Sequence, residues 1–194
     1  MISQIIHQLK LIIRTKMAET NNKTENVKLG VCSVTFGGTN LGFTKGGVEV
    51  TVETETHEVT VDQMGETPIN EYITSRTCTV SVPLAETTLE NLVKIMPGAT
   101  LVTDSSEADK KYVQVPVGTG QSLLKVAQAL VLHPIANDDA DKSEDFTVMK
   151  AATAGALNYS YMLDEERIFN CEFKAYADDD GNLFKVGDTS AVAA

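Results

Sequence analysis

The stretch that decides the fold covers residues 46–82 and reads GGVEVTVETETHEVTVDQMGETPINEYITSRTCTVSV. Valine occupies every second position from Val48 to Val52, and glutamate or threonine occupies the positions between. A period of two is typical of a strand with one buried face. The alternation resumes with reversed parity at Val59 and Val61. The pattern therefore predicts a hairpin that turns within residues 54–57.

This hairpin would separate an apolar face from an acidic one. The expected register pairs Val52 with Val59 and Glu53 with Glu58. The other expected pairs are Val50 with Val61, Thr51 with Thr60, and Glu49 with Asp62. Like charges directly opposite each other destabilise a sheet by roughly 0.2–1 kcal/mol per pair. Two interpretations fit such a face: an ordinary solvated surface, or a surface that a negatively charged molecule must pass without binding.

A third strand is expected to extend both faces. Cys78, Val80 and Val82 continue the apolar alternation, and small neutral side chains occupy the positions between. Across the three expected strands the polar face has no basic residue except near Arg76 at its edge. The residues predicted to form the polar face are Glu49, Thr51, Glu53, Glu58, Thr60, Asp62, Thr77, Thr79 and Ser81.

The segment before the hairpin is expected to hold one strand and a glycine-rich connector. Residues 27–36 alternate, which predicts a strand with Leu29, Val31 and Thr35 on one face. Residues 37–47 contain five glycines but no GxGxxG followed by a helix, which argues against a dinucleotide site. Leu41 and Phe43 are apolar enough to cover a core edge or to contact a neighbouring subunit.

A single helix is expected after the third strand. Thr87 and Glu90 have the spacing of a capping box. Apolar residues then follow at helical spacing, and Pro97 and Gly98 end the pattern after about ten residues. The stripe consists of Leu89, Leu92, Val93 and Met96. We expect it to pack against the sheet.

The second half of the chain is expected to add further strands. Residues 110–117 predict one strand, and residues 122–135 a turn followed by another. Residues 146–156 and 167–175 predict an antiparallel pair whose second strand directs Phe169, Cys171 and Phe173 inward. The segment ADDDGN at residues 177–182 predicts a turn. His133, which precedes a proline, is interpreted as a structural residue.

Composition limits the classes of function. The chain has 194 residues, a formal net charge of -11 and 42% hydrophobic residues, which fits one globular domain. The acid excess argues against phosphate-driven nucleic-acid binding. Cys32, Cys78 and Cys171 lack a CxxC pattern and are predicted to be small buried hydrophobes. The acidic loops lack EF-hand spacing and no catalytic signature occurs, so we expect no metal, no cofactor and no enzymatic activity.

The first sixteen residues, MISQIIHQLKLIIRTK, differ from the rest because they are apolar and basic. They match no secretory signal and are too short to span a bilayer. We expect the working protein to start at Met17, with residues 1–27 as a flexible leader, residues 28–188 as a single domain and residues 189–194 as a tail.

The order of these features resembles the major tail tube proteins of tailed bacteriophages. The resemblance covers about residues 28–188. The motifs that carry it are LGFTKGGVEVTVETETHEVTVDQMG, NEYITSRTCTVSVPLAETTLENLVKIMPGAT, LVLHP and FNCEFKAYADDDGNLFKVGD. The order of strand, hairpin, strand, PLAETTLENL helix and PGAT is fairly specific, whereas LVLHP alone would be weak.

The resemblance implies a mostly β fold, with two packed antiparallel sheets in a sandwich or barrel-like arrangement and one flanking helix. It also implies a structural protein of the virion tail, assembled in the host cytoplasm without a membrane. Copies would form six-membered rings that stack into a hollow tube for DNA delivery. Implied partners are the tape measure, tail terminator and baseplate or distal tail proteins, and genomic DNA would pass without specific binding.

The resemblance also assigns roles to residues. The polar face would line the lumen of the tube. The candidate inter-subunit positions are Leu41, Phe43, Thr54, Glu55, Thr56 and His57. Two alternatives remain open: the tube of a contractile phage tail-like particle, and a monomeric immunoglobulin-like or carbohydrate-binding surface module. The lack of tryptophan counts against the second alternative.

Overall fold

The computed structural model describes residues 27–28, 30–155 and 157–191. Residues 1–26 of the predicted leader, which include the expected start at Met17, lie outside the described residues, as do Leu29, Ala156 and residues 192–194. The chain divides into two units, Met1–Gly30 and Val31–Ala194. The fold below is that of the second unit.

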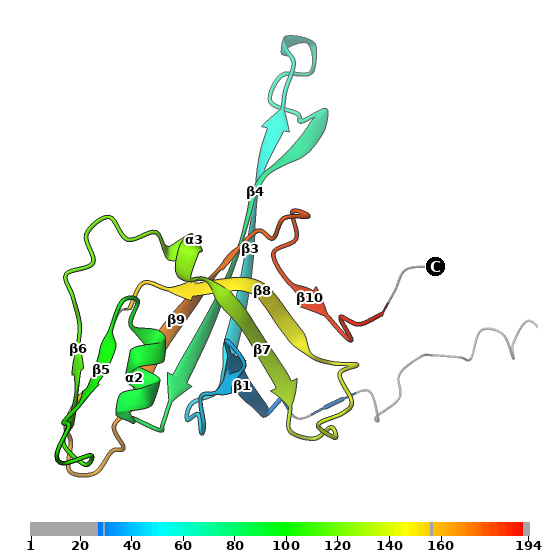
Figure 1. Cartoon of the computed structure of the whole chain (residues 1–194). Coiled ribbons are helices and arrows are strands. Elements are labelled where there is room, and N and C mark those ends of the chain that lie inside the picture. The colour runs from blue at the N-terminus through cyan, green and yellow to red at the C-terminus, as the bar shows by residue number, and fades with distance from the viewer. Residues whose placement is uncertain (1–26, 29, 156, 192–194) are drawn as a thin grey trace, which may run out of the picture. The chain divides into compact units, whose positions relative to one another are not determined.

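The second unit is mostly β, as predicted. Its main element is an eight-stranded antiparallel sheet with the order β2-β1-β7-β8-β9-β4-β3 and with β10 paired to β8 (Figure 1). Its strands are β1 (Cys32–Phe36), β2 (Thr39–Asn40), β3 (Glu49–Val59), β4 (Asn70–Leu84), β7 (Gln128–Pro134), β8 (Phe146–Thr153), β9 (Phe169–Tyr176) and β10 (Lys185–Val186). The small second sheet consists of β5 (Thr100–Thr103) and β6 (Lys111–Gln114). The helices are α2 (Leu89–Ile95), the one-turn α3 (Leu123–Val126) and the 3-10 helix η2 (Asp62–Met64).

The large sheet curls around a single core. Phe36 on β1 and Phe173 on β9 are separated in the sheet by β7 and β8, yet their ring centroids lie 4.9 Å apart. Residues 41–45 join the two ends of the curl. The Leu41 amide donates to the Val34 carbonyl of β1, and the Lys45 amide donates to the Pro83 carbonyl of β4. The core members are Val34, Phe36, Leu41, Val80, Val82, Leu84, Ile95, Leu130, Leu132, Val148, Ala151, Phe169, Cys171 and Phe173.

The predicted helix is present and flanks the sheet. It begins one residue later than the capping-box spacing suggested, because the Thr88 hydroxyl accepts a 3.2 Å hydrogen bond from the Asn91 amide. It spans seven residues, not about ten. Ile95 is buried, Leu92 and Met96 pack partly against the core, and the predicted stripe residue Leu89 is 37% exposed.

The first strand, Cys32–Phe36, is shorter than the predicted strand over residues 27–36. Val34 and Phe36 point into the core, whereas Val31 is 65% exposed. The strand begins at Cys32, so residues 29–31 precede it and their alternation says nothing about its faces. The pairing of β1 with β7 places Val34 opposite Leu132 and Phe36 opposite Leu130. Both leucines are buried, so this side of β1 faces the core.

The later strands follow the prediction. A strand lies within residues 110–117, and β7 follows the single turn of α3. Strands β8 and β9 pair antiparallel, with Phe169, Cys171 and Phe173 buried. Residues 178–182 form a turn in which the Asp178 carboxylate accepts the Asn182 amide at 2.7 Å. Strand β9 also pairs with β4, so the hairpin and the later antiparallel pair belong to one sheet.

Candidate functional site

The polar face at the root of the β3–β4 hairpin is the candidate site. Its three rows pair Glu49 with Ser81, Thr51 with Thr79, and Glu53 with Thr77. Side chains alternate between the faces of a strand, so these six share one side of the sheet. On the other side, Cys78, Val80 and Val82 are at most 1% exposed. The predicted polar and apolar faces are therefore confirmed for these residues.

Strand β9 adds charged residues that the sequence analysis did not assign to this face. Glu172 pairs with Ser81, and Lys174 pairs with Thr79. The sequence of β9 shows that Glu172 and Lys174 share a face of that strand. It contains no local signal that this strand pairs with β4, which lies about 90 residues earlier in the chain. Lys174 is a basic residue within a surface that the sequence analysis expected to be free of positive charge.

Beyond Glu53 the face continues for one more row. Glu55 pairs with Ser75, and its carboxylate accepts the Ser75 hydroxyl at 2.8 Å. Arg76, which the sequence analysis placed near the edge of the face, lies on the opposite side. Its Nε donates to the Thr54 hydroxyl at 3.2 Å. We call the set Glu49, Thr51, Glu53, Glu55, Ser75, Thr77, Thr79, Ser81, Glu172 and Lys174 the acidic face.

The predicted turn at residues 54–57 was wrong. Strand β3 runs without interruption from Glu49 to Val59, and the chain reverses over residues 60–69, which contain η2. A register shift follows Glu55, where Thr74 of β4 is left unpaired as a β-bulge. Of the two valines of reversed parity that suggested the turn, Val59 is the last residue of β3 and Val61 lies in the reversal.

Because the chain reverses later than predicted, three residues do not belong to the predicted polar face. Glu58 pairs with Glu71 and lies on the side of β3 opposite Glu53. Thr60 lies in the reversal, and Asp62 begins η2. The expected pairs Glu53–Glu58 and Glu49–Asp62 therefore do not form.

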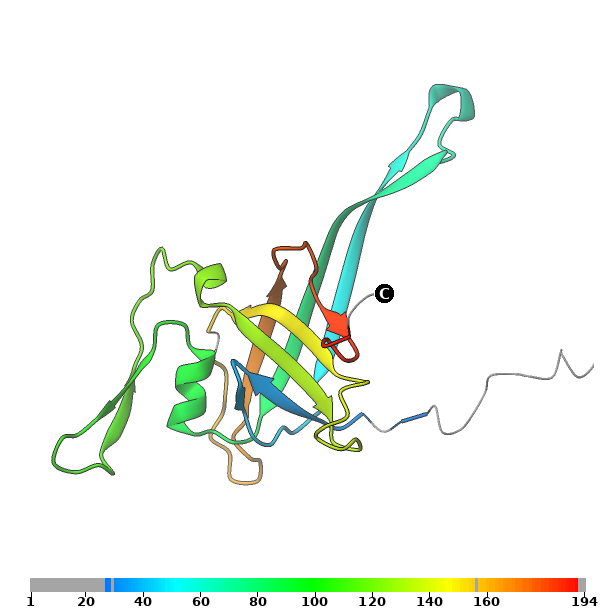
Figure 2. The ribbon, with the colours of Figure 1, turned by 45° about the vertical axis from the view of Figure 1, so that its right-hand side comes forward.

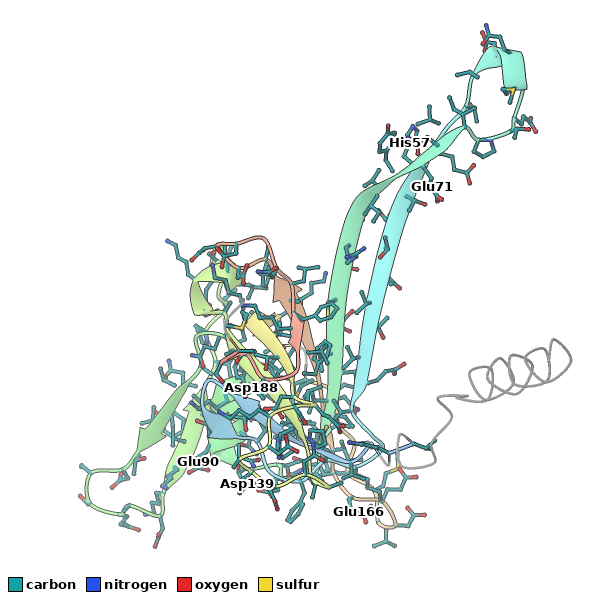
Figure 3. All side chains as sticks on the ribbon, turned by 90° about the vertical axis from the view of Figure 1, so that its right-hand side faces the viewer. His57, Glu71, Glu90, Asp139, Glu166 and Asp188 are labelled. Atoms are coloured by element: carbon teal, nitrogen blue, oxygen red, sulfur yellow. The ribbon has the colours of Figure 1, made fainter. Side chains whose placement is uncertain are left out.

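The outer part of the hairpin, residues 54–76, is a two-stranded arm. Strand β9 pairs only with residues 79–84 of β4, so β9 does not accompany the arm. Figure 2 shows the arm extending away from the rest of the second unit, and Figure 3 places His57 and Glu71 on it. Its exposed large hydrophobic side chains are Met64 at 58%, Ile69 at 52%, Tyr72 at 59% and Ile73 at 61%.

The predicted inter-subunit positions are divided between core and surface. Leu41 is completely buried in the core of its own subunit, so it covers a core edge, which was one of its two predicted roles. Phe43 is 78% exposed, and its backbone amide donates to the Glu86 carboxylate at 3.0 Å. Thr54, Glu55, Thr56 and His57 lie within the arm as strand residues.

Among the titratable residues outside the acidic face, His133 and Asp145 form the most buried polar pair. Nδ1 of His133 lies 2.7 Å from the Asp145 carboxylate, and the two side chains are 16% and 9% exposed. Nε2 of His133 has no hydrogen-bond partner within the part of the chain that the structure describes. The pair joins β7 to the start of β8, which fits the predicted structural role.

Within residues 27–28, 30–155 and 157–191, no group of three or more His, Cys, Asp and Glu side chains could hold a metal ion. All three cysteines are thiols, and burial raises the pKa of the Cys171 thiol to about 12. In the same residues no helix has the length and apolar character needed to cross a membrane.

No protein-family model and no curated protein matches the chain.

Proposed function

We propose that this chain is the subunit of a hollow tube that conducts DNA, as in the tail tube proteins that its sequence resembles. Copies would assemble into six-membered rings and the rings would stack, with the acidic face directed into the channel. The observation that carries the proposal is the composition of this face. It combines hydroxyl groups with four carboxylates and a single ammonium group.

The electrostatics of the acidic face suit a passing polyanion. Duplex DNA carries one charge per about 1.7 Å of its axis, so a wall with excess carboxylates repels it along its whole length. Screening at physiological salt limits this repulsion to about 8 Å. The wall would therefore act on DNA only at close approach, keeping it from binding without blocking its passage.

The free edge of the sheet supports assembly. Strand β3 is the last strand in the order, and within the described residues it pairs with β4 alone along its 11 residues. A strand of this length with one unpaired edge is a template for pairing with another chain. Closure of several sheets into one barrel would remove this edge in every subunit at once.

The arm also supports assembly. Both of its faces are exposed, and it carries large apolar side chains with no core beneath them. Exposed apolar surface of this kind marks contact sites between proteins.

Electron microscopy of the purified full chain tests the proposal. In negative stain we expect regular tubes with a central channel, with or without tail initiation components. Monomers alone, across a range of protein and salt concentrations and with those components present, would contradict it. A sheath gene beside this one would assign the tube to a contractile particle.

A further inference from the structure

The connection between β8 and β9 presents an exposed apolar tip. Within residues 157–168, Tyr161 is 78%, Met162 55% and Leu163 104% exposed. Tyrosine, methionine and arginine are enriched at protein interfaces. A fully exposed leucine between a methionine and three acidic residues has no stabilising role in its own subunit.

The base of this loop is held in place by several contacts. The guanidinium carbon of Arg167 lies 5.7 Å from the ring centroid of Tyr159, 5.5 Å from that of Tyr161 and 6.0 Å from that of Phe169. Its Nη2 also donates to the Thr87 hydroxyl at 2.8 Å. These cation–π contacts and this hydrogen bond order the loop before any partner arrives, which lowers the entropy cost of binding.

An ion pair between Glu166 and Lys45 ties the same loop to the segment that closes the curled sheet. Glu166 lies on the surface of the second unit in Figure 3. The exposed residues Met162 and Leu163 therefore lie in a loop that is anchored on its C-terminal side.

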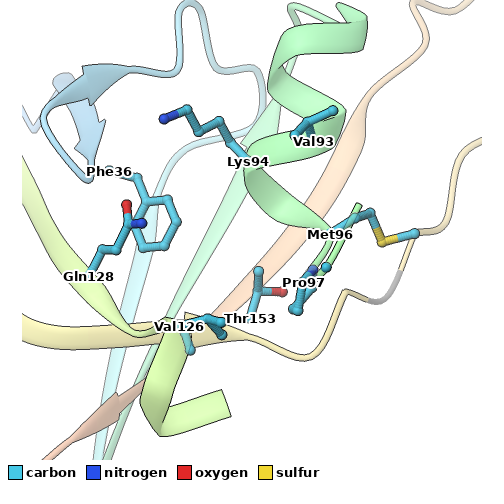
Figure 4. A pocket seen from close by; sticks show the side chains of 10 residues that line it. Phe36, Val93, Lys94, Met96, Pro97, Val126, Gln128 and Thr153 are labelled. Atoms are coloured by element: carbon cyan, nitrogen blue, oxygen red, sulfur yellow. The ribbon is translucent and has the colours of Figure 1, made fainter. Parts of the chain in front are cut away.

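A cavity elsewhere on the surface has the size and lining to receive such a tip. It has a volume of about 160 Å³ and lies between the end of α2 and the start of β7. Its lining combines the apolar side chains of Val93, Met96, Pro97 and Val126 with the polar side chains of Lys94, Gln128 and Thr153 (Figure 4). A volume of about 150 Å³ accommodates a benzene-sized group, so this cavity has room for a single leucine side chain, which would contact its apolar side chains.

The charges around the tip and the cavity are complementary. Among the described residues that line the cavity, Lys94 is the only charged one. Asp164 and Glu165 directly follow Leu163. If Leu163 entered the cavity, these carboxylates would lie at its rim near the ammonium group. Opposite charges at an interface fix the register of docking and disfavour wrong partners.

We propose that Leu163 of one copy inserts into the Val93–Met96–Val126 cavity of a second copy, with Glu165 paired to Lys94. The two contact surfaces differ, so the interface is heterologous and generates either a closed ring or an open filament. The inference rests on the proposed function in one respect, namely that copies of this chain assemble with each other.

Cross-linking between two single-cysteine variants tests the contact. Leu163→Cys protein is mixed with Val93→Cys protein under mild oxidation, and we expect a disulfide-linked heterodimer. Val117→Cys replaces Val93→Cys in the control mixture, because Val117 is 96% exposed but does not line the cavity. The parent protein supplies the background from Cys32, the least buried native thiol.

A charge exchange tests the pairing of Glu165 with Lys94. Lys94→Glu and Glu165→Lys should each weaken self-association about tenfold or more, because each places like charges together. The protein with both substitutions should regain most of the lost association. Circular dichroism of each variant separates this effect from misfolding.

The outcomes distinguish this contact from the tube itself. Tubes in the microscope without a heterodimer or charge rescue would overturn the contact and leave the tube proposal standing. A heterodimer with charge rescue but no tubes would support the contact and contradict the tube. A disulfide that forms only within one chain, in a Leu163→Cys and Val93→Cys double variant, would overturn the contact between copies.

Discussion

At the scale of single residues, Asn91 joins three parts of the fold. Its side-chain Nδ2 donates to the Leu41 carbonyl and to the Glu86 carbonyl, each at 2.9 Å. Asn91 lies on α2 and is 8% exposed. One amide therefore attaches the flanking helix both to the segment that closes the curled sheet and to the residues that follow β4.

Asn91→Ala should destabilise the domain by about 1–3 kcal/mol, because it leaves two carbonyl groups without their donor. The cap at Thr88 uses the Asn91 backbone amide and remains. Urea unfolding followed by circular dichroism measures the loss. Asn182→Ala is the matched control, since the Asn182 side chain is exposed and hydrogen-bonds the Asp178 carboxylate within its own turn. Equal losses in the two variants would contradict the assigned role.

Cys171 makes stability depend on alkaline pH. Burial raises the pKa of its thiol from 9.0 to about 12 in the folded state. Between these values the unfolded thiol loses its proton while the folded thiol keeps it, so stability falls as pH rises. The fall is at most about 1.4 kcal/mol per pH unit.

Unfolding free energies measured near pH 9 and near pH 11 check this effect. Cys171→Ala should lose less stability over that range than the parent protein, because its side chain does not titrate. In the folded parent, Cys171 should also resist a thiol reagent that labels Cys32, which is only half-buried. An identical pH slope in the variant and the parent would show that other groups account for it.

At the scale of elements, the arm contributes little to the stability of its own subunit. Replacing residues 57–72 with Asn-Gly would connect Thr56 to Ile73, which already pair across the hairpin. We expect the melting temperature to stay within about 4 °C, since a change of 1 kcal/mol moves it by about 2–4 °C in a chain of this length. Tubes should no longer form, because exposed apolar contacts are lost.

Leu130→Ala provides the comparison for the arm deletion. Leu130 is completely buried, so its truncation should cost about 2–5 kcal/mol. A larger fall in melting temperature for the arm deletion than for Leu130→Ala would show that the arm packs on its own subunit. If the shortened chain formed normal tubes, the arm would not be required for assembly.

The acidic face is tested by reversing its charge. Glu49→Lys combined with Glu53→Lys leaves an excess of ammonium groups, which should attract DNA and slow its passage. The altered side chains are exposed, so tubes should still assemble. The measurement is the rate of DNA ejection from particles built with the variant.

Asp138→Lys combined with Asp139→Lys is the control for the charge reversal. These exposed residues lie in the loop between β7 and β8 and do not belong to the acidic face, and the net charge changes equally. If particles with Glu49→Lys and Glu53→Lys ejected DNA at the normal rate, the charge of the acidic face would not control the passage of DNA.

At the scale of the whole molecule, the formal net charge of -11 opposes contact between copies. Screening shortens the range of this repulsion from about 30 Å at 0.01 M salt to about 3 Å at 1 M. Assembly should therefore increase with salt concentration, as measured by sedimentation of the purified chain. A decrease with salt would show that ion pairs between copies outweigh the overall repulsion.

The sequence by itself determined which side chains share a face where a strand lies on the core. Alternation correctly separated Val80 and Val82 from Thr79 and Ser81, and it placed Phe173 inward. It also located the flanking helix within one residue of its N-cap. These features depend on local periodicity and on local capping chemistry, and a single sequence contains both.

Only the tertiary structure decided where the hairpin turns and which strand lies beside it. Parity identifies a buried face only where a core lies beneath the strand, so the valines of the exposed arm suggested a turn that does not exist. The pairing of β4 with β9 brought Glu172 and Lys174 to the acidic face. Such pairings join segments about 90 residues apart. They depend on how the whole sheet curls around its core, which local periodicity does not encode.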